Sequence, residues 1–133
     1  MQADSDAHWV QLRFRDVDAF GHVYHAEYLT LLDEARTRWF REALGMVNPS
    51  DYVLARVEID YVSSLLLADG TVRAAFAVEH VGRTSLTLVE RMYAGDGREV
   101  SRSRVVTVLR DPTSGASRPL TEEERSRAEA LGG

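Results

Sequence analysis

Apolar and polar positions alternate near the start of the chain. Over residues 10–15 each apolar side chain is followed by a polar one, with Val10, Leu12 and Phe14 on the apolar side. A period of two is typical of a strand that buries one face. We therefore expect the first strand over residues 10–15, with Phe14 pointing into the core.

The period changes over residues 26–44, where apolar side chains recur at three- and four-residue steps. The positions that fall on one helical face are Tyr28, Leu31, Leu32, Ala35, Trp39 and Ala43. Leu29 and Phe40 widen this face to about half of the helix circumference. Such a wide apolar face predicts a long helix that is embraced by a sheet.

Four strand-like runs follow the helix, and turn signals separate them. The alternation covers residues 53–61, 72–78, 86–93 and 98–110, with LADG, HVGRTS and AGDG between them. A terminal helix is expected over residues 120–131, with Thr121 as N-cap and Glu124 as its capping-box partner. One long apolar helix and a run of hairpin-joined strands predict an α+β fold, in which the helix covers one face of an antiparallel sheet.

The composition limits the classes to which this chain can belong. By size its 133 residues form a single domain over residues 1–133, and the net charge of −5 argues against a nucleic-acid partner. There is no cysteine, and all 16 basic residues are arginine, which excludes disulfides, a thiol nucleophile and lysine Schiff-base chemistry. Because no apolar run approaches membrane-spanning length and the first residues lack a secretion signal, we expect a cytoplasmic protein with no membrane partner.

The stretch DVDAFGHVYHAEY, residues 16–28, gathers ionisable and aromatic side chains at the junction between the first strand and the long helix. Backbone N–H groups at a helix N-terminus have no intrahelical acceptor and favour a developing negative charge. A carboxylate beside them could act as base or nucleophile toward a carbonyl group whose oxygen lies on those donors. The same composition also suits an ordinary turn, so the residues alone leave both interpretations open.

The segment LRFRDVDAFGHVYHAEYLTLLDEART, residues 12–37, resembles the signature of hotdog-fold thioesterases of the 4-hydroxybenzoyl-CoA thioesterase type. It is especially similar to the short-chain acyl-CoA branch found with bacterial Tol–Pal genes, which shares the pattern D-x-D, then G-x-V-Y-H-x-x-Y, then an acidic residue and Arg on the helix. The resemblance implies a sheet wrapped around one long central helix, hydrolysis of an acyl thioester to free acid and thiol, and no cofactor. It also implies a homodimer that pairs again into a homotetramer.

The resemblance assigns roles to residues of the 16–28 stretch. Asp18, the second Asp of the pair, corresponds to the carboxylate that attacks the thioester carbonyl or activates water to do so. His25 falls at the helix N-terminus that polarises the carbonyl through a backbone N–H, with the imidazole as an accessory. Tyr24 is expected to bind substrate, and Gly21, which has no Cβ, would let the backbone approach it closely.

Other ionisable residues near this stretch have structural interpretations. Asp16 extends the apolar side of the first strand and Arg36 falls inside the apolar arc of the helix, so we expect them to point inward and pair. Spacing alone does not choose between Asp16 and Asp18 as the catalytic carboxylate; the resemblance favours Asp18, with Glu34 as a reserve. His22 is expected to be a turn residue and not a metal ligand, because four credible ligands are not evident.

A second part of the site is implied at EHVGRTSL, residues 79–86. In the resembled family the corresponding turn contacts the CoA nucleotide, and Arg83, Thr84 and Ser85 match its basic and hydroxyl groups in type. The basic cluster is thinner here than in the family, which leaves an acyl-carrier protein open as the thioester donor. Without the resemblance, an exposed hairpin turn explains the same residues.

Two other functions on the same fold stay open. A hotdog hydratase or dehydratase would carry a different His-bearing motif, which this sequence lacks in the expected arrangement. A non-catalytic acyl-thioester binding protein would not need the Asp18 carboxylate. We therefore expect an acyl-CoA thioesterase, and release of thiol from an acyl thioester would distinguish it from both alternatives.

Overall fold

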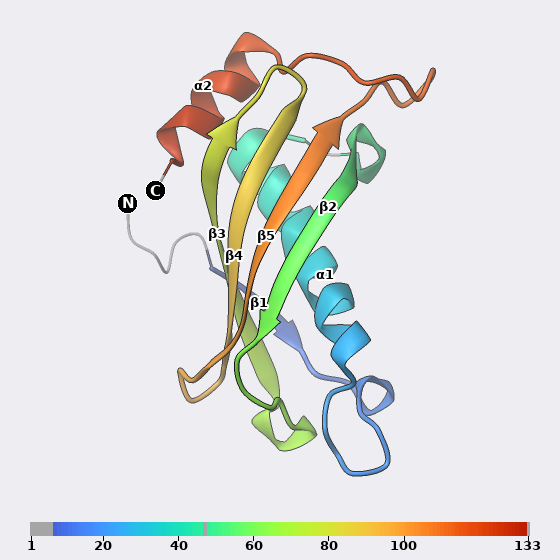
Figure 1. Ribbon diagram of the computed structural model, residues 1–133, viewed down its shortest axis with the longest axis vertical. Helices are drawn as coiled ribbons and strands as arrows, with labels where there is room; N and C mark the ends of the chain where they lie inside the picture. Colours follow the sequence, from blue (N-terminus) through green and yellow to red (C-terminus); the bar gives the residue numbers. More distant parts are fainter. Residues whose placement is uncertain (1–6, 47, 133) are drawn as a thin grey trace.

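The computed structural model describes residues 7–46 and 48–132 (Figure 1). Five antiparallel strands form one sheet in the order β1-β3-β4-β5-β2, and the long helix α1 lies across one face of it. The α+β hotdog fold expected from the sequence is thus confirmed. The helices and strands are β1 Ala7–Gln11, α1 His25–Leu44, β2 Tyr52–Tyr61, β3 Thr71–Val81, β4 Ser85–Ala94, β5 Glu99–Leu109 and α2 Glu122–Ala130, with 3-10 turns η2 Phe14–Asp16, η3 Pro49–Asp51 and η4 Leu67–Asp69.

Helix α1 forms where the periodicity predicted it. It ends at Leu44, and its C-cap Gly45 has a φ of 73°, the left-handed conformation that closes many helices. Phe40 is buried as expected, but Leu29 is 36% exposed, so the apolar face is narrower than predicted at this point. The residues of α1 that are buried against the sheet are Tyr28, Leu31, Leu32, Ala35, Arg36, Trp39, Phe40 and Leu44.

The first strand lies earlier in the chain than the predicted range 10–15, because it begins at Ala7. β1 ends at Gln11, and the next residues turn into η2. Leu12 is buried, but Phe14 is 84% exposed, so the prediction that Phe14 points into the core is wrong. The alternation breaks because the Arg13 backbone N–H donates to Asp16 Oδ2 at 2.8 Å, which closes a tight turn in place of a further strand pair.

Strand β2 is an edge strand that α1 leaves largely uncovered. Along most of β3, buried residues alternate with partly exposed ones, and most residues of β4 are buried. By contrast, most of the ten residues of β2 are exposed. Its exposed side chains include Val53 and Leu54 at 39% each and Tyr61 at 46%. One edge of the sheet therefore presents apolar side chains and unpaired backbone groups together.

The terminal helix α2 is capped as the sequence predicted. Thr121 Oγ1 accepts the Glu124 N–H at 3.1 Å, and Glu124 Oε1 accepts the Thr121 N–H at 2.8 Å. Arg125 donates to the carbonyl of Gly82 at 3.0 Å, which ties α2 to the β3–β4 turn. Within the described ranges, no helix is both long and apolar enough to cross a membrane.

Candidate active site

A short loop, residues 17–24, joins η2 to α1 and carries most of the predicted site residues. Val17 and Val23 form an antiparallel bridge at its base, and the Asp18 N–H donates to His22 O at 2.8 Å. Gly21 has a φ of 78°, which side-chain-bearing residues rarely adopt, and a Cβ there would meet open space. The turn therefore requires Gly21 for its backbone conformation, and its close approach to a substrate stays a prediction.

The Asp18 carboxylate is oriented by the backbone of its own loop. Its Oδ1 accepts the N–H of Phe20 at 2.9 Å and the N–H of His22 at 3.2 Å. The residue is nevertheless exposed. These bonds hold one carboxylate oxygen in place, and the exposed group can meet a bound molecule or an attacking water.

The N-terminus of α1 follows this loop directly. Tyr24 is the N-cap and His25 is the first helical residue, and the Tyr24 side chain makes no capping hydrogen bond. N–H groups of the first helical turn lack intrahelical acceptors and lie at the positive end of the helix dipole. The junction thus combines a carboxylate with donors that can polarise a carbonyl group.

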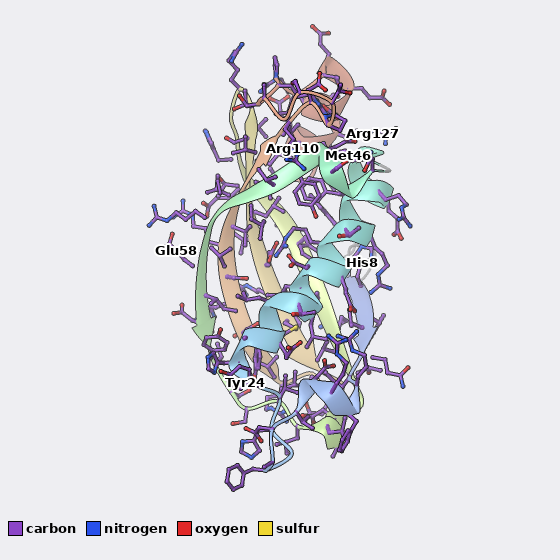
Figure 2. All side chains as sticks on the ribbon, turned by 90° about the vertical axis from the view of Figure 1, so that its right-hand side faces the viewer. His8, Tyr24, Met46, Glu58, Arg110 and Arg127 are labelled. Carbon is purple, nitrogen blue, oxygen red and sulfur yellow. The ribbon has the colours of Figure 1, made fainter. Side chains whose placement is uncertain are left out.

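Aromatic side chains from β2 and α1 meet at the same junction. The Tyr61 hydroxyl donates to the His25 carbonyl at 3.2 Å, and its ring lies edge-on to Tyr28 with centroids 5.0 Å apart. The Tyr24 ring lies 4.4 Å from the His25 imidazole, and Figure 2 shows Tyr24 at the lower end of α1 beside the end of β2. Sequence reasoning missed Tyr61, although the alternation over residues 53–61 places it on the helix-facing side with Ile59.

Asp16 is buried, as predicted, but its partner is different. Its carboxylate accepts from Arg13 Nε at 3.1 Å and Arg13 Nη2 at 3.2 Å, so the predicted pair of Asp16 with Arg36 is wrong. Arg13 also donates to Glu34 at 2.9 Å, and its hydrogen bond with Asp16 raises the pKa of Arg13. Asp16 and Glu34 thus flank one arginine that ties η2 to α1, which favours structural roles for both.

Arg36 pairs with a carboxylate that the sequence analysis did not single out. Its Nε and Nη2 donate to Glu90 on β4 at 2.6 and 2.7 Å, and both side chains are nearly inaccessible to solvent. Nη1 donates to Asp33, which is 59% exposed. Burial raises the pKa of Glu90, although the Arg36 guanidinium beside it acts in the opposite direction. Burial also lowers the pKa of Arg36, but the hydrogen bond to Glu90 and its negative charge outweigh this effect, so the pKa of Arg36 is raised. A charged pair lies between α1 and the sheet.

The turn predicted to bind the CoA nucleotide lies at the far end of the molecule from the 17–24 loop (Figure 1). Arg83 and Thr84 lie in the β3–β4 turn beside α2, and Ser85 begins β4. The Arg83 carbonyl accepts the Leu120 N–H at 3.1 Å. The Arg83 side chain is exposed. Within one chain the structure does not bring these residues together with Asp18.

The described residues contain no evident metal centre. In residues 7–46 and 48–132, no three or more His, Asp or Glu side chains lie close enough together to hold an ion. His22 is exposed in the loop, and its backbone forms a bridge with Leu66.

A family model and a curated relative each match more than four fifths of the chain. Residues 12–127 match the model of the thioesterase-like superfamily. A curated relative, the acyl-CoA thioester hydrolase YbgC of Escherichia coli, is 26% identical over 117 residues, which cover 84% of this chain and 86% of the relative.

Solved structures share the fold. A thioesterase from Thermus thermophilus, crystallised with coenzyme A and Zn, is 32% identical with a TM-score of 0.82; the match covers 94% of this chain and 92% of that one. A predicted thioesterase from Bacillus stearothermophilus, 22% identical, has a TM-score of 0.83 and 96% of each chain covered, and at this identity it supports the fold alone.

Proposed function

Because this chain belongs to the thioesterase-like superfamily, we propose that it hydrolyses acyl thioesters of coenzyme A to the free acid and the thiol. The observation that carries the proposal is the junction between the 17–24 loop and α1. There an exposed, oriented Asp18 carboxylate precedes the N–H donors of a helix N-terminus by a few residues. The YbgC relative and the CoA-bound thioesterase make acyl-CoA the substrate class of choice. The association with Tol–Pal genes stays a prediction.

In the proposed reaction the thioester carbonyl oxygen lies on the N–H groups at the start of α1, His25 among them. Asp18 takes a proton from water as the water oxygen bonds to the carbonyl carbon, and the C–S bond then breaks. The departing thiolate receives the proton. In the alternative route Asp18 itself attacks, and water hydrolyses the resulting anhydride. Both routes need the same carboxylate, and in both the helix N-terminus stabilises the oxyanion.

Two subunits are proposed to share each site. β2 is an exposed apolar edge strand, and antiparallel pairing of two β2 strands would extend the sheet across a twofold axis. Such pairing reverses one subunit relative to the other, so the β3–β4 turn of one would lie toward the α1 N-terminus of its partner. Arg83 and Asp18 would then act on one thioester. The family resemblance further leads us to expect that two such dimers pair into a tetramer.

We expect sedimentation at micromolar concentration to show a dimer or tetramer. A charge placed on the exposed apolar edge, as in Leu54→Glu, should shift the protein toward monomers because it would be buried without a partner. Thr113→Glu, on the exposed loop before α2, is the matched control and should leave assembly unchanged. A stable wild-type monomer would reject the shared-site arrangement.

Arg83→Ala is expected to raise KM for acyl-CoA about tenfold while kcat stays close to the wild-type value. The reason is that Arg83 is proposed to hold the CoA phosphates, which bind equally in the ground state and the transition state. A short pantetheine thioester lacks the nucleotide and should be nearly indifferent to the change. Equal losses on both donors would show that the turn acts on the protein's structure and not on the nucleotide.

The proposed activity is tested by thiol release from a panel of acyl-CoAs and acyl-carrier-protein thioesters. Steady turnover of acyl-CoA supports the proposal, and turnover of the carrier-protein donors alone would change the substrate class. A binding protein would release no thiol yet would be stabilised against thermal unfolding by the ligand. A hydratase would instead change the absorbance of enoyl thioesters without thiol release.

A further inference from the structure

The 17–24 loop rests on a second loop, residues 62–70, which joins β2 to β3. The Val23 N–H donates to Leu65 O at 2.8 Å, and the Leu67 N–H donates to Gly21 O at 3.2 Å. His22 and Leu66 form a bridge between these two bonds. Two backbone hydrogen bonds thus join the loop that orients the Asp18 carboxylate to residues 65–67 of the second loop.

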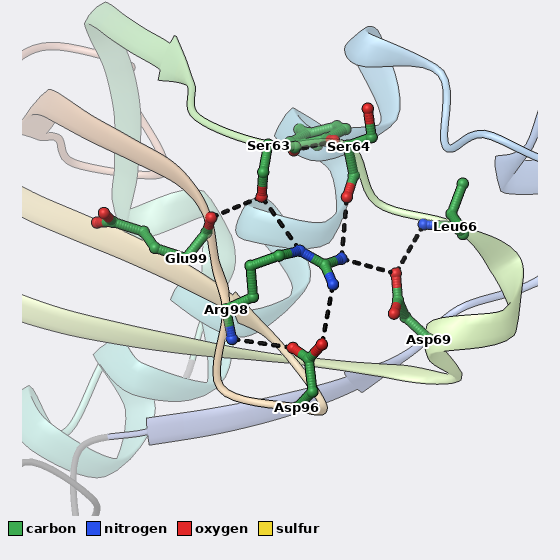
Figure 3. Close-up of polar contacts among 8 residues, drawn as sticks. Ser63, Ser64, Leu66, Asp69, Asp96, Arg98 and Glu99 are labelled. Atoms are coloured by element: carbon green, nitrogen blue, oxygen red, sulfur yellow. Dashed lines mark hydrogen bonds and ion pairs between the residues drawn. The ribbon is translucent and has the colours of Figure 1, made fainter.

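One arginine from elsewhere in the chain spans the 62–70 loop (Figure 3). Arg98 comes from the β4–β5 turn, and its Nε donates to Ser63 Oγ at 3.3 Å while Nη2 donates to Ser64 O at 3.0 Å. Nη2 also contacts Asp69 Oδ2 at 3.1 Å. The guanidinium therefore joins the first residues of the loop to its last turn.

Asp69 links Arg98 to the part of the 62–70 loop that contacts the 17–24 loop. The same Asp69 Oδ2 that meets Arg98 accepts the Leu66 N–H at 2.8 Å, as Figure 3 shows. Leu66 is the residue that forms the bridge with His22. At the other side, Arg98 Nη1 is bound to Asp96 in its own turn at 2.9 Å, which holds the guanidinium in one orientation. Hydrogen bonds thus connect the β4–β5 turn to the 17–24 loop through the Leu65–Leu66 peptide group, whose carbonyl accepts the Val23 N–H.

We propose that Arg98 is a positioning residue that sets the place of the Asp18 carboxylate through the 62–70 loop. This inference rests on the proposed function, because it matters for turnover only if Asp18 takes part in the reaction. The Arg98 side chain is 39% exposed, and exposed ion pairs contribute little to overall stability. Its forked geometry can bind two ends of a loop at once, which a single point charge does less well. Its effect is therefore expected in geometry rather than in global stability.

Arg98→Met removes the fork and keeps much of the side-chain length. Amide hydrogen exchange of Val23 and Leu67, whose N–H groups make the contacts between the loops, should become about tenfold faster. Exchange in α1 and β3 should stay the same. kcat should fall about tenfold, less than the roughly 100-fold that a misplacement of 1 Å can cost, with KM within about twofold. Arg98→Lys keeps the charge but not the forked guanidinium, so its exchange rates and kcat should lie between those of wild type and Arg98→Met.

The matched control is Arg102→Met. Arg102 lies on β5, four residues after Arg98, and its side chain is 54% exposed. It pairs with Glu99 at 2.6 Å and not with the 62–70 loop. It should leave both exchange and kcat at wild-type values.

Three results would overturn the proposal. These are wild-type exchange at Val23 and Leu67 in Arg98→Met, a loss of kcat without faster exchange, and an equal effect of Arg102→Met. An active Asp18→Asn variant would instead reject the role of Asp18. The exchange measurement would still decide whether Arg98 holds the loop, so the two failures can be told apart.

Discussion

Replacement of Asp18 by asparagine is expected to lower kcat for acyl-CoA hydrolysis about a hundredfold or more, within the range of a placed general base. The melting temperature should stay almost unchanged. Asn keeps an Oδ1 that can accept the N–H groups of Phe20 and His22, so the loop keeps its shape while the negative charge is lost. Thiol release and thermal unfolding of one purified sample give both quantities.

Asp16→Asn is the matched control, because it changes the other carboxylate of the same motif. Asp16 is completely buried and bound by Arg13, so the variant should lose about 1–3 kcal/mol of stability. Its kcat should fall far less than that of Asp18→Asn whenever the protein stays folded. His25→Ala keeps the backbone N–H of the first helical turn and should also be milder. A stable and fully active Asp18→Asn protein would reject the proposed mechanism.

The largest loss of stability is expected at Glu90. Glu90→Gln removes the negative charge that faces the buried Arg36 guanidinium, and we expect a loss of about 3 kcal/mol in the free energy of unfolding. The value lies at the lower end of the range for a broken buried pair because Asp33 still contacts Arg36. Denaturant unfolding of the two proteins measures the difference.

Two further variants decide whether the cost comes from an unpaired buried charge. Arg36→Met combined with Glu90→Leu removes both charges and should recover most of the lost stability. Glu123→Gln changes a carboxylate on α2 that is 75% exposed and contacts Arg127 at 2.9 Å, and should stay within about 0.5 kcal/mol of wild type. Equal losses in Glu123→Gln and Glu90→Gln would contradict the interpretation.

Local patterns predicted the elements that depend on neighbours in sequence. The helical period over residues 26–44 predicted α1, and the reciprocal hydrogen bonds of Thr121 and Glu124 were expected from a spacing of three residues. Apolar alternation and turn residues likewise predicted β2 to β5 and the β3–β4 and β4–β5 hairpins. The expected hairpin between β2 and β3 is wrong, because β2 pairs with β5 at the edge of the sheet. The first strand failed at Phe14, because a local hydrogen bond from Arg13 to Asp16 turned the chain where the alternation alone predicted continuation.

In the candidate site, too, the sequence predicted what depends on neighbouring residues and missed what depends on long-range contacts. The sequence alone placed Asp18, Gly21, Tyr24 and His25 in one short stretch before a helix, and the structure brings them into one loop-and-helix junction. The sequence did not reveal that Tyr61 contacts His25 from β2. It also did not reveal that the β3–β4 turn, which carries Arg83, lies at the opposite end of the molecule from the 17–24 loop. Which ends of strands lie together depends on strand order, and a linear pattern does not contain strand order.

By itself the sequence determined the long helix, the β3–β4 and β4–β5 hairpins and the capped terminal helix, because each follows from contacts between residues close in sequence. The order of these elements indicated the α+β class. Only the tertiary structure decided which charges pair. Arg36 meets Glu90, 54 residues away, and Arg98 reaches Asp69, 29 residues away. In a chain whose 16 basic residues are all arginine, many ion pairs are chemically equivalent in sequence. Helix packing and strand register bring particular side chains within bonding distance, and they alone select among these pairs.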